Sequence, residues 1–274
     1  MNQKGLTKIS FLKKSISLFV LLLLLVALKP AGLCQKPEKP PQTLRPVNED
    51  VLKGINLLYD WKFKEAESLF QKVIADSPDR PVGYFYMAMV TWSYMSTGYW
   101  APKTVNEYKE RIDRTIDVAK GRINSNQADS YDYLYLGGAL GFKGRFELMQ
   151  RSWLASFLLA VDAIDALKTC LKMDPTNKEV LLGLGIFDYY TARLSGVLKF
   201  LSYLLIHRGD KEEGLRKLNV AAREAVYSSS EAKNVLLHTY LFLEEDFPSA
   251  LKFAVDLSEK YKDGPRYPLL KGVC

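Results

Sequence analysis

The sequence predicts an all-α fold, a right-handed α-solenoid of helix-turn-helix units, and three observations support this prediction. Apolar residues recur at helical spacing from about Asp50 onward. Small and apolar residues return at the same offsets in separate stretches of the chain. Pro78 and Pro175 close two of these stretches at equivalent positions. We expect about ten or eleven helices on this repeat pattern.

The first 34 residues have the layout of a secretory signal peptide. Lysines precede the apolar run ISLFVLLLLLVAL, Ile16 to Leu28, which is shorter than the roughly 20 residues of a transmembrane helix. Small residues at Gly32 and Cys34 suit cleavage before Gln35, so we expect export to the periplasm. Two alternatives stay open: a lipidated Cys34, although Leu33 is a poor match to a lipobox, and an uncleaved membrane anchor.

The net charge does not indicate a nucleic-acid partner. The chain carries 38 basic and 31 acidic residues, a formal charge of +7. Five of the basic residues and none of the acidic ones lie in the first 34 residues, so the remainder carries only +2. A basic surface of the kind that binds DNA or RNA is therefore not expected.

The predicted domain organisation has three parts. Residues 1–34 are the signal peptide, and residues 35–49 contain QKPEKPPQTLRP, whose prolines favour extended polyproline II over helix or sheet. Residues 50–274 form one helical repeat domain. The sequence thus predicts a tether followed by the solenoid.

The first helix-turn-helix unit is VLKGINLLYDWKFKEAESLFQKVIADSP. Its Gly, Ala, Phe and Pro fall at the positions that define a tetratricopeptide repeat (TPR), namely Gly54, Ala66, Phe70 and Pro78. The second helix of a later unit, AIDALKTCLKMDPTN, repeats the offsets at Ala163, Leu167, Cys170 and Pro175. The next unit then has its Leu-Gly pair at Leu184 and Gly185, and a further second helix contains Ala250 and Ala254.

The stretch LYLGGALGFKGR, Leu134 to Arg145, has two interpretations: a strand leading into a phosphate-binding loop, or a helix. The spacing of Gly138, Gly141 and Gly144 is not G-x-G-x-x-G, and the stretch lacks the Gly-Lys-Ser/Thr of a P-loop. The repeat register favours a helix, with Gly137 and Gly141 on one face where a neighbouring helix approaches closely.

Three segments resemble a known family. They are YLGGALGFKGR, KMDPTN, and LLGLGIFDYYTARLSGVLKFLSYLLIHRGDKEEGLRKL. They resemble bacterial, envelope-located TPR proteins of unassigned function, distantly similar to the eukaryotic inclusion-body-clearance TPR family. The resemblance implies an all-helical TPR fold and an interaction role, and it supplies no catalytic residues. It also implies a further repeat after Gly264, where this chain ends in PRYPLLKGVC, so we expect an incomplete last unit.

Recognisable catalytic and metal-binding motifs are absent from the sequence. His207 and His238 lie in separate units, and neither Cys170 nor Cys274 belongs to a C-x-x-C motif. The RGD at 208–210 is interpreted as the start of a helix. We therefore expect no cofactor, no metal and no enzymatic activity, with an unrecognised acid pair as the remaining catalytic alternative.

The inner, concave face of the solenoid is the predicted binding surface, because its helices are rich in aromatics. The candidate groove residues are Tyr84, Tyr86, Trp92, Tyr131, Tyr189, Tyr190 and Arg193. The register places Asp188 in a seam between helices, where Arg145 or Arg193 would satisfy its charge.

The predicted function is that of an exported, non-catalytic scaffold that binds an unidentified protein or peptide partner in this groove. The alternative is a carrier of an apolar ligand, or a protein associated with a membrane surface, through LSGVLKFLSYLLI at 194–206. The sequence does not specify the oligomeric state.

Overall fold

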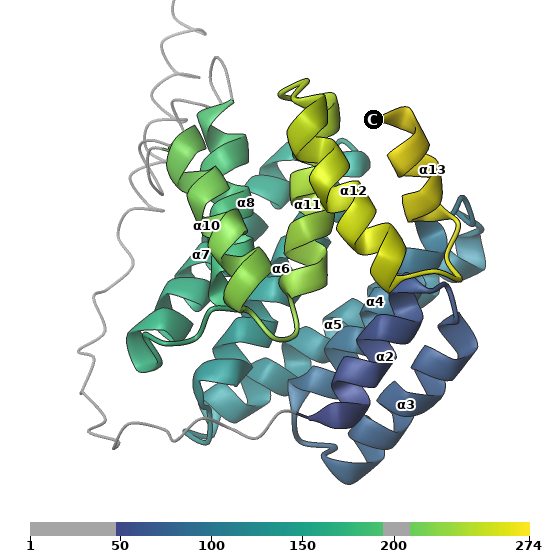
Figure 1. Ribbon diagram of the computed structural model, residues 1–274. Helices are drawn as coiled ribbons and strands as arrows, with labels where there is room; N and C mark the ends of the chain where they lie inside the picture. Colours follow the sequence, from purple (N-terminus) through teal and green to yellow (C-terminus); the bar gives the residue numbers. More distant parts are fainter. Residues whose placement is uncertain (1–47, 194–208) are drawn as a thin grey trace, which may run out of the picture. The chain divides into compact units, whose positions relative to one another are not determined.

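The computed structural model describes residues 48–193 and 209–274, in which every regular element is a helix (Figure 1). The all-α prediction is confirmed. The signal peptide, most of the linker, the apolar segment 194–206 and His207 lie outside the described residues. The eleven helices of the described part are α2 (Glu49–Tyr59), α3 (Phe63–Asp76), α4 (Pro81–Met95), α5 (Pro102–Asn124), α6 (Ser130–Met149), α7 (Trp153–Met173), α8 (Val180–Ala192), α10 (Lys211–Glu224), α11 (Ser229–Phe242), α12 (Phe247–Lys260) and α13 (Arg266–Val273).

The helices pack in pairs, as the repeat pattern predicts. The pairs are α2–α3, α4–α5, α6–α7, α8–α10 and α11–α12, and α13 packs on α12. The first helices of successive pairs also contact one another, from α2 to α4, α6, α8 and α11. The first helices therefore form an inner layer and the second helices an outer layer, the arrangement of a TPR-like solenoid.

Several helices begin where the sequence supplies a cap. The side chains of Asn48, Asp210 and Asp246 accept hydrogen bonds from backbone N–H groups at the starts of α2, α10 and α12. Asp129 and Asp132 form a capping box at the start of α6. The RGD aspartate is therefore a helix cap, as predicted.

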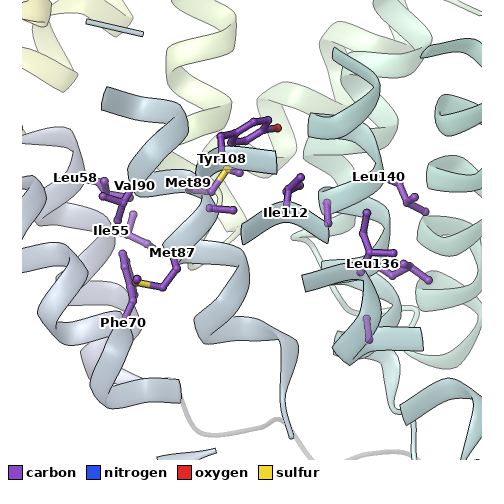
Figure 2. Close-up of a cluster of buried hydrophobic side chains, with 14 of the residues drawn as sticks. Ile55, Leu58, Phe70, Met87, Met89, Val90, Tyr108, Ile112, Leu136 and Leu140 are labelled. Atoms are coloured by element: carbon purple, nitrogen blue, oxygen red, sulfur yellow. The ribbon is translucent and has the colours of Figure 1, made fainter. Parts of the chain in front are cut away.

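The largest core lies between α2 and α6. Figure 2 shows Phe70 of α3 and Met87 of α4 beside Ile55 of α2, with Ile112 of α5 and Leu136 of α6 continuing the cluster. All five side chains are buried. Because each helix buries one apolar stripe against two neighbours, the helical spacing of the sequence becomes a continuous core.

The repeat positions mark the seams between helices. A Cβ on Gly54 would lie 2.4 Å from the Phe70 ring, so this glycine allows α2 to approach α3 closely. Gly185 of α8 faces Gly214 of α10 in the same way, with a Cβ 3.0 Å from the Gly214 carbonyl oxygen. Ala66 and Cys170 are fully buried, as their positions in the repeat predict.

The stretch from Leu134 to Arg145 is helical and lies within α6, so the helix interpretation is confirmed. Gly137 faces α7, because an added Cβ would lie 2.7 Å from Leu167 Cγ and 3.0 Å from the Ala163 carbonyl oxygen. The expectation for Gly141 was wrong. This glycine is exposed and has no atom within 4 Å of its would-be Cβ.

The two glycines provide a matched pair of substitutions. We expect Gly137→Leu to lower the free energy of unfolding by about 1 to 3 kcal/mol, because the new side chain overpacks the α6–α7 seam. Gly141→Leu should raise it by roughly 0.5 kcal/mol, because an exposed glycine is a poor helix former. Urea unfolding monitored by circular dichroism measures both. Equal effects at the two positions would contradict the packing described here.

The first pair contacts the last pair. The Tyr59 ring of α2 stacks on that of Tyr261, with centroids 4.9 Å apart, and its hydroxyl donates to Glu231 Oε2 at 2.6 Å. The backbone N–H of Asn48 donates to the Tyr227 hydroxyl at 2.8 Å. The inner face of α2 is therefore covered by the C-terminal helices of the same chain.

Candidate functional site

Four tyrosines lie together where α4 and α6 meet the α10–α11 turn. We call them the inner tyrosine cluster, and they are Tyr86, Tyr131, Tyr135 and Tyr227. The Tyr135 ring centroid lies 6.1 Å from that of Tyr86 and 6.4 Å from that of Tyr131. Burial raises the pKa of Tyr131 to about 12, and the Glu179 carboxylate adds to the rise. These hydroxyls therefore remain protonated at physiological pH.

Glu179 holds the α10–α11 turn against this cluster. Its carboxylate is buried and accepts hydrogen bonds from the backbone N–H groups of Val226, Tyr227 and Ser228, at 2.6, 3.0 and 2.7 Å. Such bonds to an ionised acceptor are stronger than neutral ones. Tyr86 and Tyr131 lie on the inner layer, as predicted, but the chain's own turn packs there.

Tyr189, one of the predicted groove residues of α8, lies in a seam between helices. Tyr189 is fully buried, and its hydroxyl donates to Glu244 of the α11–α12 turn. The prediction that Tyr189 faces the groove was wrong, because α10 packs on this side of α8, with Gly214 against the Tyr189 backbone. Asp188 does lie in the seam, as predicted, and pairs with Lys217 of α10.

The proposed Asp188–Arg145 pair is not formed. Arg145 of α6 instead lies over the Trp92 ring, 5.3 Å from its centroid. The ring of Trp92, which belongs to α4, also packs against Phe142 of α6. Tyr84 also departs from the prediction. It lines a shallow pocket of about 210 Å³ among α3, α4 and α5, and Arg114 of α5 lies over its ring. Both aromatics therefore pack between helices within the described structure.

Tyr190 and Arg193 remain accessible at the end of α8. Tyr190 is 44% exposed, and its ring packs edge-on against Tyr189. Arg193 is exposed, and its guanidinium contacts Glu244 Oε1 at 3.2 Å. Of the predicted groove residues, these two have the exposure that partner binding requires.

Two exposed phenylalanines flank the α11–α12 turn that contains Glu244. We call Tyr190, Arg193, Phe242, Glu244 and Phe247 the Glu244 patch. Burial alone would raise the pKa of Glu244, but hydrogen bonds from Lys211 and Tyr189 outweigh it and hold the pKa below its usual value. Glu244 therefore stays ionised and fixes Arg193 and the buried Tyr189 relative to the α11–α12 turn.

The sequence reasoning missed three members of this patch. Phe242, Glu244 and Phe247 lie in LFLEEDFP, where a first helix ends and a second begins. An aromatic at each end of a turn between paired helices is a recognisable pattern. Its proximity to α8 depends on how the pairs pack, which the sequence does not state.

Most buried charges have structural partners. Arg122 of α5 is 9% exposed, and its Nε lies 3.0 Å from both carboxylate oxygens of Asp132. Arg80 donates to Asp129 and lies 3.4 Å from Asp132. This network ties the start of α6 to α5 and to the loop before α4.

Other kinds of site were sought among the described residues. No group of three or more His, Cys, Asp or Glu there is arranged to hold a metal ion. His238 is half-buried, and its Nδ1 lies 2.7 Å from the Asn234 carbonyl oxygen. None of the helices in this part of the chain has the length and apolar character needed to cross a bilayer.

Comparison with known proteins gives a likeness to a solved structure. No protein-family model and no curated protein matches this sequence. Among solved structures, the chain is similar to TTC0263, a thermophilic TPR protein of Thermus thermophilus. The TM-score is 0.46 at 14% sequence identity, covering 81% of this chain and 95% of that one. The fold assignment rests on the helix pairing described above.

Proposed function

We propose that this chain is a non-catalytic scaffold of the bacterial envelope that binds a protein or peptide partner through the Glu244 patch. The observation that carries the proposal is the set of exposed aromatics and an exposed arginine around one fixed carboxylate. Aromatic and arginine side chains contribute most of the binding energy in protein interfaces.

The ion pairs at this patch prearrange it for binding. Glu244 holds Arg193 and Lys211 at 3.2 and 2.5 Å, so part of the side-chain ordering is complete before a partner arrives. The patch also displays both signs of charge, since Glu245 is exposed beside it. A partner surface with complementary charges and an apolar centre would fit it.

Two variants test this assignment by crosslinking in intact cells. Replacing Tyr190 and Phe242 together with alanine should abolish recovery of the crosslinked partner, while circular dichroism and the melting temperature stay nearly unchanged, because both side chains are exposed. The matched control replaces Leu269 and Val273, exposed apolar side chains of α13, and should retain the partner. Recovery of the partner with the Tyr190 and Phe242 variant, or its loss in the control as well, would contradict the proposal.

Several buried ionisable groups form structural bonds, which supports the non-catalytic part of the proposal. Asp188, Asp132 and Glu179 each form structural bonds, to Lys217, to Arg122 and to a helix-starting backbone. Burial raises the pKa of the Cys170 thiol to about 12, which disfavours the thiolate that a nucleophile requires.

Export is the second part of the proposal, and it rests on the apolar run from Ile16 to Leu28. Mass spectrometry of the protein recovered from the envelope should find an unmodified N-terminus near Gln35. An acylated Cys34 would show a lipid anchor instead. A chain that begins at Met1 would show that the segment is retained.

The apolar-carrier alternative receives little support from the described residues. One shallow pocket there has a volume of about 210 Å³ and lies among α3, α4 and α5. It is smaller than the about 300 to 1,000 Å³ that sites for drug-sized ligands usually enclose.

A further inference from the structure

Exposed apolar side chains concentrate on two neighbouring turns that the proposed function does not use. Sixteen large apolar side chains are exposed in the described residues, and eight of them belong to the α4–α5 and α6–α7 turns and the helix ends beside them. We call these eight the turn patch, and they are Tyr94, Tyr99, Trp100, Leu148, Met149, Trp153, Leu154 and Leu158. Exposed apolar side chains gathered on neighbouring turns indicate an interaction site.

The two turns lie side by side because the helices that carry them pack together. The Trp92 ring of α4 lies 5.5 Å from that of Phe142 in α6. The Tyr108 ring of α5 lies 5.4 Å from that of Phe146 in α6, and Lys109 lies over the Phe146 ring. These contacts are close to the C-terminal ends of α4 and α6 and the start of α5. The turn patch is therefore supported by packed aromatics.

The opposite ends of the same helices are polar. The loop between α3 and α4 reads SPDR, and the loop between α5 and α6 reads SNQAD. The contrast is visible within α7 itself. Its first residues Trp153 and Leu154 are 55% and 71% exposed, whereas its last turn contains Lys172 and leads into DPTNK. The apolar exposure thus belongs to one end of the helix pairs.

Charge within the turn patch itself is positive. Residues 94–103 and 148–158 contain the exposed bases Lys103 and Arg151 and no aspartate or glutamate. Charges of both signs border these two segments, with Arg145 and Glu147 before Leu148, Glu107 after Lys103 and Asp162 after Leu158. Apolar tips with positive charge between them complement an anionic surface with an apolar interior.

We propose that the turn patch docks on the surface of an anionic lipid bilayer. Trp and Tyr are the residues preferred at the level of lipid headgroups, where the ring enters the apolar region and the polar group stays hydrated. Leu154 and Leu158 reach the acyl boundary, and Arg151 and Lys103 contact the headgroup phosphates. The contact is peripheral, because only helix ends and turns enter the bilayer.

This bilayer contact is distinct from the Glu244 patch. The Glu244 patch has Arg193 and Lys211 beside Glu244 and Glu245, so its charges balance and an anionic surface does not attract it as it attracts the turn patch. The protein can therefore rest on a membrane through one surface and hold a partner through the other. The two proposals fail independently.

A fluorescent probe at one position tests the docking in the full-length protein. A local probe is needed because vesicle binding through the N-terminal apolar segment would not report on the turn patch. Cys34 and Cys274 are first replaced with serine, leaving Cys170 buried. Leu154→Cys then receives the fluorophore NBD, and Met173→Cys, at the other end of α7 and 39% exposed, is the matched control. Vesicles of phosphatidylcholine are compared with vesicles that also contain phosphatidylglycerol.

We expect the NBD emission at position 154 to shift to the blue and rise several-fold with phosphatidylglycerol vesicles, and the signal at position 173 to stay constant. Adding Arg151→Glu and Lys103→Glu should reduce the response. No response at position 154, or equal responses at the two positions, would overturn the proposal. Blue-shifted emission without vesicles would also overturn it, because the patch would then be covered by protein. A shift that depends on protein concentration would identify the covering surface as a second copy, and a shift that does not would identify it as the chain itself.

Discussion

Replacing Arg122 with methionine is expected to lower the free energy of unfolding by roughly 3 to 5 kcal/mol, the usual effect of removing one member of a buried ion pair. Asp132 is 1% exposed and receives two contacts of 3.0 Å from Arg122 Nε. Arg80 lies 3.4 Å from Asp132 and also serves Asp129, so it offsets only part of the loss. Methionine keeps the volume of the side chain while removing its charge.

Arg122 also holds two elements besides α6. Its Nη1 donates to Asp79 at 2.6 Å and its Nη2 to the Gln127 carbonyl at 2.7 Å, so the loops on both sides lose a contact. Urea unfolding at pH 7 measures the effect. Arg216→Met is the control, because Arg216 forms two short bonds to Glu213 on the surface of α10 and should have little effect. Similar losses in both variants would show that burial is not the cause.

Gly214→Val is expected to destabilise the protein by about 3 kcal/mol or more, at the upper end of overpacking effects. A Cβ at this position would lie 2.6 Å from the Tyr189 backbone nitrogen and 2.9 Å from the Gly185 carbonyl oxygen. Both are backbone atoms, which cannot rotate away, so α8 and α10 have to separate. The separation would also weaken the Asp188–Lys217 pair across the seam.

Thermal unfolding followed by circular dichroism measures this effect. The control is Gly121→Ala on α5, where no atom lies within 4 Å of the would-be Cβ and a gain of roughly 0.5 to 1 kcal/mol is expected. A melting temperature for Gly214→Val close to that of the unchanged protein would contradict the close approach of α8 and α10.

The sequence predicts the local packing of this fold well, because that packing depends on short spacings. Gly54 and Phe70 meet within one helix pair, as do Gly137 and Leu167, and the repeat offsets identify these positions. The same reasoning cannot distinguish Gly137 from Gly141. The two glycines are one helical turn apart, and which of them meets α7 depends on the crossing of the two helices.

The candidate site was harder to predict, because it depends on contacts between distant parts of the chain. Tyr189 reaches Glu244, 55 residues later, and Asp188 pairs with Lys217, 29 residues later. Helical periodicity gives the face on which a side chain lies, but it does not show which later helix covers that face. Tyr190 and Arg193 remain exposed at the end of α8, although the adjacent Tyr189 is buried.

The contact between Tyr59 and Glu231 joins residues 172 positions apart. In an ordinary repeat array each unit touches only its neighbours, so the units that leave the ribosome first can fold while the rest is being made. Here α2 gains its stacking partner Tyr261 only when the C-terminal helices have been synthesised. The nascent chain therefore cannot complete the packing of α2 until Tyr261 has left the ribosome, so the first pair waits for residues made about 200 positions later.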